Sequence, residues 1–512
     1  MNTRANRYVI GADVGSQGMK TVLLAADGAV IASAYAAYDP RYPAPNWAEE
    51  NPADWEQALA TTVRQVMQSA NIHPADVAAL ALGSQVDGLV CVGPQDEVLL
   101  PAIIWLDRRA TEQCSALEER INPTDLFHLT GANLDSSHVA PKMLWVRDNE
   151  PRVFERARYL LLPGSYMAYR LTGEAVVDYS NASSTLLLDV RQKAWSQRLL
   201  QATGIDEQRL GRVAGATEVI GPLTHQAAER LGLTEHTLVA VGSGDEHAAC
   251  VGAGVTDSHI VCDINGTAEP VCAVAQTPIF DEGGLLETHC HADPAAWLIE
   301  NPGFVSGGSY RWFLDAFAPH LRAEAAQRGV SPYDLLNAEA TGVPAAAGGL
   351  IFLPCLSGAM TPTWNADASG VFFGLSLAHG RGHMVRAILE GTAYGLKDNV
   401  DRMAAIGLNP QEIRAVAGGA RGRLWLQIKA DVTGKPISVP QELETTALGA
   451  AMLAGVAGGL FADLREAASA AVEVTTYIEP DPAQRQVYDE AYSLYRDVYN
   501  ALQDSFRKAA QR

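Results

Sequence analysis

The sequence has little positive charge. Its 38 Lys and Arg stand against 59 Asp and Glu, which gives a net charge of −21 at pH 7. Nucleic acids and anionic membrane surfaces are bound through clustered basic residues, so this balance argues against both kinds of partner. Cysteine is also sparse: the seven residues are scattered, and none forms a Cys-x-x-Cys pair. Such usage is typical of reduced thiols in a cytosolic protein.

Long hydrophobic runs are missing as well. The longest uncharged stretch, residues 445–462, is rich in Ala and Gly and falls short of the ~20 strongly apolar residues that a membrane span needs. We therefore expect a closely packed internal helix there, although Gly455-x-x-x-Gly459 could also suggest a membrane dimer face. Met1–Arg7 is polar and leads into an apolar run, so no secretory signal is expected. These absences predict a cytoplasmic protein.

The rest of the composition is that of a globular protein. Hydrophobic residues make up 48% of the chain and charged residues 19%, which is not the composition of a disordered chain. The chain of 512 residues is too long for one ordinary core, so we expect two domains of roughly 250 residues. We place them at 1–250 and 251–512, joined within continuous structure near 246–258, because no low-complexity linker separates them.

Strand and helix patterns alternate along both halves. Apolar runs predict strands at 77–82, 238–241 and 413–417. Helical spacing predicts helices at 55–70, 141–149 and 382–406, and a polar helix is expected to open at 106–109 and run to residue 120. This alternation is typical of an α/β fold.

Residues 8–32 contain three apolar runs around a turn rich in Gly and Ser, which predicts a β-hairpin rather than a strand entering a helix. Gly15 and Gly18 tolerate positive φ and let backbone N–H groups approach one anion closely. Asp13 leads the turn and Lys20 follows it. An acid, free amides and a lysine suit Mg²⁺ with a polyphosphate. On this stretch alone, an ordinary surface hairpin is the simpler interpretation.

The second half repeats this pattern weakly. Residues 259–274 again place two apolar runs around a small turn, Asn265-Gly266-Thr267. Two half-chains that each begin with such a hairpin suggest a duplicated domain with a cleft between the copies.

Familiar nucleotide-binding motifs are absent. The chain has no G-x-x-x-x-G-K-[ST] sequence, and His247 stands where a dinucleotide fingerprint starting at Gly242-x-Gly244 needs a third glycine. Phosphate binding would therefore have to use the hairpin turns.

Taken together, these segments resemble the FGGY family of carbohydrate kinases, which includes glycerol kinase, xylulokinase and ribulokinase, and within it most closely the xylulokinases. The resemblance extends from about residue 8 to residue 465. Five segments match in the family's order: Asp13-Val14-Gly15-Ser16 with Lys20, Lys142-Met143-Leu144-Trp145 with Asn149, residues 370–375, residues 383–390, and Gly418-Gly419-Ala420-Arg421. Each match alone is modest evidence, and the five together are strong.

The resemblance implies two actin-like, ribonuclease-H-like domains flanking a catalytic cleft, with the sugar mainly on the first and ATP on the second. It implies Asp245 as the general base, for which a simple helix N-cap is the alternative interpretation. Asp13 would reach Mg²⁺ through water. The residues implied near ATP are Gly15, Ser16, Lys20, Gly266, Thr267, Gly308, Gly418, Gly419, Ala420 and Arg421.

For the sugar, the resemblance implies a set that includes the base: Gln85, Val86, Asp87, Trp105, Asp107, Asp245 and Glu246. Asp87 stands where xylulokinases carry a histidine, and a carboxylate only accepts hydrogen bonds whereas a neutral histidine donates one and accepts one. Glu246 stands where Asn or Gln is common. These departures bear on which sugar is bound more than on the reaction. Trp105 could equally be a core residue.

The resemblance therefore implies ATP-dependent phosphorylation of a small ketose, D-xylulose giving D-xylulose 5-phosphate, with ATP and Mg²⁺ and with a homodimer left open. L-xylulose, ribulose and a polyol such as erythritol are alternatives within the same class. Outside it, the alternatives are an actin-like ATPase without a sugar substrate and a catalytically silent sugar-sensing module.

Two further groups are interpreted as structural. Residues 289–291 (His-Cys-His) alternate between the faces of an expected strand, and no second ligand cluster follows at zinc spacing. After a turn at residues 307–308, aromatic residues recur at helical spacing, and we expect them all in the core: Tyr310, Trp312, Phe313 and Phe317.

Overall fold

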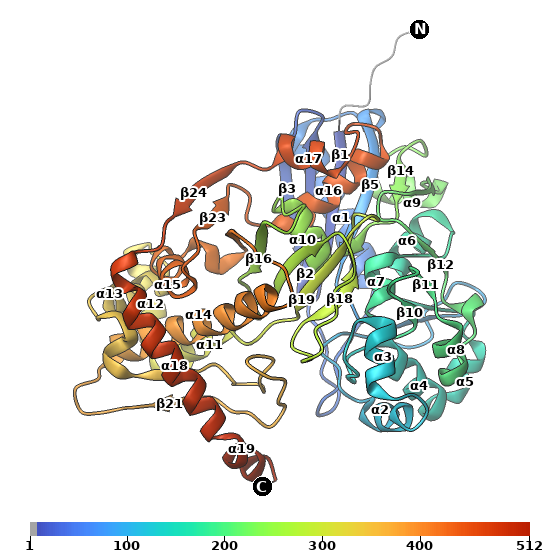
Figure 1. Cartoon of the computed structure of the whole chain (residues 1–512). Helices are drawn as coiled ribbons and strands as arrows, with labels where there is room; N and C mark the ends of the chain where they lie inside the picture. The colour runs from blue at the N-terminus through green and yellow to red at the C-terminus, as the bar shows by residue number, and fades with distance from the viewer. Residues whose placement is uncertain (1–7, 512) are drawn as a thin grey trace.

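Two seven-stranded sheets, one from each half of the chain, form the framework of the computed structural model, which describes residues 8–511 (Figure 1). The polar segment Met1–Arg7 considered above lies outside the described residues. The first sheet has the order β13 (Val219–Pro222), β14 (Leu238–Ala240), β5 (Val77–Ser84), β1 (Tyr8–Gly15), β2 (Gly18–Ala25) and β3 (Val30–Ala37), with β15 (Ser243–Gly244) paired to the end of β5. The second has the order β18 (Glu287–Cys290), β19 (Trp297–Asn301), β17 (Val271–Ala275), β16 (Ile260–Ile264), β22 (Glu412–Val416), β23 (Ile437–Pro440) and β24 (Val474–Ile478).

The two sheets repeat one topology. In the first, β1 and β2 form an antiparallel hairpin, β3 extends it, and β5 and then β14 add in parallel on the other side of β1. In the second, β16 and β17 form the hairpin, β19 extends it, and β22 and then β23 add in parallel beyond β16. The predicted duplication and the predicted α/β fold of two related halves are thereby confirmed.

The opening hairpin has the predicted form. Gly15 at the end of β1 lies opposite Gly18 at the start of β2, so Ser16 and Gln17 alone make the turn. The hydroxyl of Tyr38 donates to the carbonyl oxygen of Gly15 at 2.6 Å. The segment that directly follows β3, the neighbour of β2, therefore holds the turn.

Three helices match the spacing in the sequence: α1 (Pro52–Ala70), α4 (Val139–Asn149) and α14 (Arg381–Ala405). α1 begins where the side chain of Asn51 accepts a hydrogen bond from the N–H of Ala53, and it ends at Asn71 in the left-handed region. The polar helix expected to run from 106–109 to residue 120 is shorter than predicted, because α2 covers only Thr111–Glu118.

The remaining helices of the first half are α3 (Pro123–Thr130), α5 (Pro151–Arg156), α6 (Pro163–Thr172), α7 (Tyr179–Ser183), α8 (Gln197–Thr203), α9 (His225–Leu231) and α10 (Asp245–Gly252). Those of the second half are α11 (Gly307–Phe317), α12 (His320–Arg328), α13 (Pro332–Thr341), α15 (Arg423–Thr433), α16 (Thr445–Ala457), α17 (Leu464–Ala471), α18 (Arg485–Ala501) and α19 (Gln503–Ala510). Short strand pairs complete the fold: β4 (Glu49–Glu50) with β7 (Ala102–Ile103), β6 (Val90–Val92) with β8 (Tyr159–Leu161), β9 (Val176–Asp178) with β12 (Arg212–Ala214), β10 (Leu188–Asp189) with β11 (Ala194–Trp195), and β20 (Ile351–Leu353) with β21 (Val371–Phe373).

Helices α10 and α16 pack against each other beside the first sheet (Figure 1). α16 comes late in the chain, yet it packs on β1 and β5 of the first sheet. The approach is so close that a Cβ at Gly11 would lie 2.1 Å from the backbone nitrogen of Ala451. The expectation of a closely packed internal helix at 445–462 is confirmed. No helix within residues 8–511 is long and apolar enough to cross a membrane.

The expectation of four core aromatics in α11 is half wrong. Tyr310 and Phe313 are buried, but Trp312 is 37% exposed and Phe317 is 52% exposed. Trp312 lies about 100° around the helix from Phe313 and nearly opposite Tyr310, and Phe317 is the last helical residue. The two outer rings contact each other edge to face, with centroids 5.2 Å apart. Residues 307–308 are the first turn of α11 rather than a separate turn.

Candidate active site

Asp245 lies at the junction between β15 and α10. Gly244 of β15 and Val14 of β1 both pair with Ser84 of β5, one on each side. Because the carboxyl ends of parallel strands meet at one edge of a sheet, Asp245 and the end of the first hairpin lie at the same edge. Gly242 makes this possible: its φ is 79°, and a Cβ there would meet the neighbouring strand at 2.1 Å.

The charges around Asp245 are mostly negative. Burial raises the pKa of Asp245 to about 7, although the N–H of Glu246 donates to its Oδ1 at 3.0 Å and favours the ionised form. Burial also raises the pKa of Asp13 well above its usual range; Asp245 and Glu444 add to this rise, and Lys20 opposes it. A carboxyl group that titrates near neutrality can accept a proton from a hydroxyl at physiological pH.

Lys20 and Asp13 lie directly opposite each other on β2 and β1. The ammonium of Lys20 lies 3.2 Å from the carboxylate of Glu444, just before α16. Gly15 and Ser16 are partly exposed at the turn. The hairpin therefore presents an acid, a lysine and an accessible turn beside Asp245, which is the arrangement that the sequence predicted for polyphosphate and metal.

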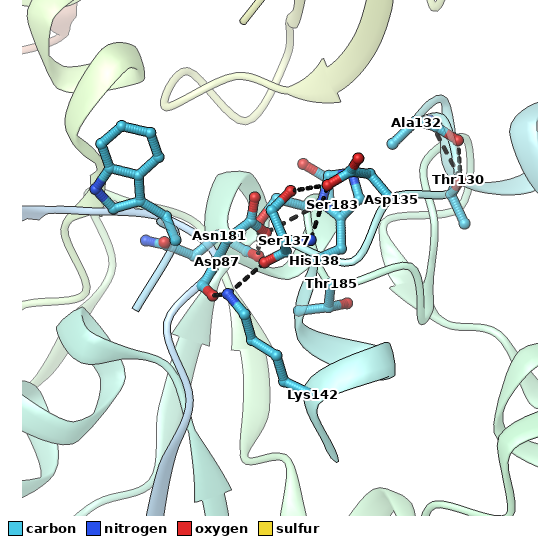
Figure 2. Close-up of polar contacts among 12 residues, drawn as sticks. Asp87, Thr130, Ala132, Asp135, Ser137, His138, Lys142, Asn181, Ser183 and Thr185 are labelled. Atoms are coloured by element: carbon cyan, nitrogen blue, oxygen red, sulfur yellow. Dashed lines mark hydrogen bonds and ion pairs between the residues drawn. The ribbon is translucent and has the colours of Figure 1, made fainter. Parts of the chain in front are cut away.

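Asp87 and His138 form a buried pair (Figure 2), and the charge of Asp87 acts on Asp245. Nδ1 of His138 lies 3.2 Å from Oδ1 of Asp87. Burial would lower the pKa of His138, but Asp87 outweighs it and raises that pKa to about 9. Burial would raise the pKa of Asp87, but His138 and Lys142 hold it below its usual range. At neutral pH the pair is therefore an imidazolium next to a carboxylate.

Three other residues named for the sugar border this area. Trp105 is 36% exposed, so the alternative of a core tryptophan does not hold. Val86 lies beside Gly244, since a Cβ built on that glycine would come within 2.9 Å of the Val86 side chain. Burial raises the pKa of Glu246 well above its usual range, and the neighbouring Glu300 adds to the rise. A protonated Glu246 offers one donor and one acceptor, as the Asn or Gln common at this position would.

Protein partners bind two residues named for the sugar, Asp107 through its carboxylate and Gln85 through its amide nitrogen, while Oε1 of Gln85 is buried without a hydrogen-bond partner among residues 8–511. The side-chain amide of Gln85 donates to Glu50 at 3.0 Å, and Gln85 is buried. The carboxylate of Asp107 is fully buried and accepts hydrogen bonds from the guanidinium of Arg109 and, at 2.6 Å, from the N–H of Ala48. Both side chains join separate segments of the first half, and contact with a sugar stays a prediction for them.

The residues of the second half that were named for the nucleotide lie around one turn. The N–H of Gly307 donates to the carbonyl oxygen of Gly266 at 3.2 Å, and the N–H of Gly308 donates to that of Thr267 at 3.0 Å. On the other side, the N–H of Gly419 donates to the carbonyl oxygen of Asn265 at 2.9 Å. Three segments far apart in the sequence are thus joined by backbone hydrogen bonds around one turn.

The loop that contains Gly418 and Gly419 carries backbone strain. Ala417, directly before it, has φ 63° and ψ −166°, a region that is almost restricted to glycine. Ala420 is buried and Arg421 is exposed. Strained residues cluster at binding sites, so this geometry marks the loop as a candidate binding element.

The residues described here fit Mg²⁺ held mainly by a nucleotide. Asp13 faces the negative charges of Asp245 and Glu444 with only Lys20 to oppose them, a surplus that a cation would neutralise. Mg²⁺ usually takes one or two carboxylates together with water and substrate phosphates. No group of three or more His, Cys, Asp or Glu side chains within residues 8–511 is arranged to hold a metal by itself.

His138 and Glu300 were not identified from the sequence. His138 meets Asp87 across 51 positions of sequence, and a single histidine before a helix gives no pattern that would mark it. Glu300 comes from β19 of the second half and lies 3.4 Å from Nε2 of the buried His289. His289 therefore has carboxylate partners within the protein, as its structural interpretation requires.

Comparison with known protein families identifies the family to which the chain belongs. The model of the N-terminal domain of the FGGY family of carbohydrate kinases matches residues 8–252, and that of the C-terminal domain matches residues 264–458. The chain belongs to the FGGY family. It is therefore an ATP-dependent carbohydrate kinase with a sugar and ATP as substrates, and the alternative of an actin-like ATPase without a sugar does not fit.

Individual FGGY kinases resemble the whole chain. The xylulose kinase of Escherichia coli (strain K12) is 32% identical over 494 residues, which cover 96% of this chain and 99% of that protein. The crystal structure of ligand-bound xylulose kinase from Lactobacillus acidophilus superposes with a TM-score of 0.89 at 28% identity, covering 98% of this chain and 99% of that one. The crystal structure of gluconate kinase from the same organism gives a TM-score of 0.88 at 28% identity and the same coverage.

Proposed function

We propose that this FGGY kinase transfers the γ-phosphoryl group of ATP to a hydroxyl group of a small neutral ketose, D-xylulose, to give D-xylulose 5-phosphate. The observation that supports the proposal is that Asp245 lies at the same sheet edge as the hairpin of Asp13 and interacts electrostatically with both Asp13 and Asp87. Residues 1–250 would contribute the sugar pocket, the first phosphate turn and the base, and residues 251–512 the nucleotide site.

In this proposal Asp245 orients the attacking hydroxyl and accepts its proton while the phosphoryl group is transferred. A pKa of about 7 for Asp245 leaves the carboxylate available at physiological pH and makes it a stronger base than an exposed aspartate. Asp87 accepts hydrogen bonds from sugar hydroxyls, and protonated His138 and Glu246 donate them. Trp105 supplies an apolar ring for the carbon face of the sugar.

On the other side, Gly15, Ser16, Gly266 and Thr267 would approach the phosphates with their backbone N–H groups, and Lys20 would leave Glu444 to join them. The loop at 418–421 would close over the adenosine. Asp13 would hold Mg²⁺ through water, and Mg²⁺ bound with ATP would supply positive charge against that of the transferred group. Closure of the two halves would exclude water and limit ATP hydrolysis.

The charge of the pocket favours a neutral acceptor over gluconate. A sugar acid would bring its carboxylate toward the ionised Asp87, and the protonated His138 is already paired with Asp87 at 3.2 Å. Unpaired like charges at close range oppose binding. L-xylulose, ribulose and four- or five-carbon polyols such as erythritol carry no charge, so they stay alternatives within the same class.

A coupled assay of ATP turnover with a panel of acceptors tests the proposal. The panel contains D-xylulose, L-xylulose, D-ribulose, erythritol and gluconate, together with a reaction without acceptor. We expect D-xylulose to give the highest kcat/KM and the reaction without acceptor to be slow. A higher kcat/KM for gluconate would overturn the neutral-acceptor argument, and acceptor-independent turnover would overturn the site assignment.

We also propose a cytoplasmic location, since the described cysteines are all free thiols and nearly all are buried. The homodimer left open by the sequence is tested by light scattering coupled to size-exclusion chromatography. A mass of twice 54.6 kDa would support it, and the mass of one chain would exclude it.

A further inference from the structure

Two lysine side chains, Lys142 and Lys429, are fully buried in the structure. Lysine is almost never fully buried unless its ammonium is paired. Lys142 belongs to the segment by which α4 resembles the FGGY family, but neither the proposed phosphate sites nor the proposed sugar contacts use it. The burial of Lys142 therefore needs an explanation by a different role.

Three backbone carbonyl groups bind the amine of Lys142, and Figure 2 shows those of Asp87 and Ser137. It donates to the carbonyl oxygen of Asp87 at 2.6 Å and to that of Ile104 at 2.8 Å. It also donates to the carbonyl oxygen of Ser137. An ammonium has three N–H donors and no acceptor, so these contacts use its full capacity.

Each of the three carbonyls belongs to a different loop. The first is that of Asp87 itself, after β5. The second precedes Trp105, after β7, and the third precedes His138, just before α4. Asp87, Trp105 and His138 are therefore each within one residue of a carbonyl oxygen that Lys142 binds.

Lys142 itself is kept away from any ligand. It is fully buried, whereas Trp105 is 36% exposed. Burial lowers the pKa of Lys142 to about 7, with Asp87 and Asp107 acting in the opposite direction. Three N–H donors are present below this pH and two above it, so the amine holds the loops in either state.

We propose that Lys142 is the positioning residue of the acceptor pocket: it sets the relative places of Asp87, Trp105 and His138 without touching the sugar. The inference rests on the proposed function of these three residues. Displacement of a binding group by about 1 Å can cost roughly 10²-fold in reaction rate. Loss of the three hydrogen bonds should therefore weaken use of the acceptor and leave use of ATP nearly unchanged.

Two substitutions give a graded test. Lys142→Gln keeps two N–H donors, and Lys142→Met has a side chain of similar length to Gln without donors. We expect kcat/KM for D-xylulose to fall by about 10-fold in the first and about 100-fold in the second, with KM for ATP within twofold of the wild type. A role in stability alone would lower the melting temperature and the fraction of active enzyme without raising KM for the sugar.

Lys429 provides a matched control on the nucleotide side. Its ammonium lies 2.6 Å from Asp263 and 2.9 Å from Glu269, at the two ends of the hairpin turn that contains Gly266 and Thr267. Lys429→Gln disturbs an equally buried amine, but we expect it to raise KM for ATP and not KM for the sugar. If the Lys142 and Lys429 variants changed both KM values alike, the effect would be global and the proposal would be wrong.

The remaining outcomes are also decisive. An unchanged KM for the sugar in both Lys142 variants would overturn the inference. Failure of both variants to fold would overturn it as well, because Lys142 would then be needed for the folding of the first half. The activity of the wild type distinguishes failure of the positioning inference from failure of the proposed function. A wild-type enzyme without acceptor-dependent turnover would contradict the function, whereas an active wild type with unaffected variants would contradict the positioning role alone.

Discussion

Nδ1 of His138 lies 3.2 Å from Oδ1 of Asp87, and each residue sets the protonation state of the other. Without Asp87, burial would favour the neutral imidazole. Without the imidazolium, burial would favour the protonated carboxyl group. The pocket therefore combines a charged acceptor with a charged donor, and a change at either position alters both.

Asp87→His tests this pair. The substitution removes the carboxylate, and the pKa of His138 should fall from about 9, so that two neutral rings replace an ion pair. We expect an altered order of preference across the panel of ketoses and polyols, with KM for ATP unchanged. The exposed pair Asp257–His259, 3.1 Å apart, supplies the control: Asp257→His should leave the profile as it is. An unchanged sugar profile in Asp87→His would remove Asp87 from the pocket.

Asp245→Asn tests the general base. The amide keeps the size of the side chain but cannot accept the proton of the attacking hydroxyl. We expect kcat to fall by roughly 10²–10⁴-fold, with ATP binding, measured by calorimetry, little changed. A variant that retains near-full turnover would show that Asp245 is only the first residue of α10.

The pH dependence of the reaction should report the environment of Asp245. Its pKa is raised to about 7, and the base must be ionised to act. The rate should therefore rise with pH through about 7 and fall below it, and kcat/KM for the sugar is the parameter to follow at saturating ATP. An acid limb near pH 4, as for an exposed aspartate, would contradict the burial of this carboxyl group.

The fold was predictable from the sequence wherever the decisive contacts are local. The hairpin of β1 and β2 needs only a two-residue turn between apolar runs, and helices α1, α4 and α14 follow their own spacing. The packing of α16 on β1 was not visible, because it depends on Gly11 meeting Ala451 from the other end of the chain. Exposure of Trp312 and Phe317 was likewise missed, since helical spacing does not say which side of α11 is covered.

The site was predictable in part for the same reason. The place of Asp245 follows from a local strand-to-helix pattern together with the family resemblance. His138 could not be found, since its partner Asp87 lies 51 positions away. Gln85 and Asp107 give a second reason. A polar side chain in a binding motif can form hydrogen bonds with other groups of the protein, and only the structure shows those bonds.

Gly419→Ala tests whether the loop at 418–421 belongs to the nucleotide site. A Cβ at Gly419 would lie 2.2 Å from Cγ of Asn265, whereas one at Gly422 would meet no atom closer than 3.4 Å. The first substitution should push the loop away from the Gly266–Thr267 turn and raise KM for ATP by about 10-fold or more, and Gly422→Ala should change it little. Equal effects of the two, or a selective change in KM for the sugar, would contradict the assignment.

The last prediction concerns the helix pair that carries the base. A Cβ at Gly449 of α16 would lie 1.8 Å from the carbonyl oxygen of Ala248 in α10, so Gly449→Ala must separate the two helices. Overpacking of this kind costs about 1–3 kcal/mol, and the melting temperature should fall accordingly. Gly342→Ala is the control, because Gly342 has an ordinary negative φ and no atom within 4 Å of its Cβ position. Since α10 begins at Asp245, the displaced helix should also lower kcat in the protein that remains folded; a stable variant with full kcat would mean that the base is held by β15 and not by its helix.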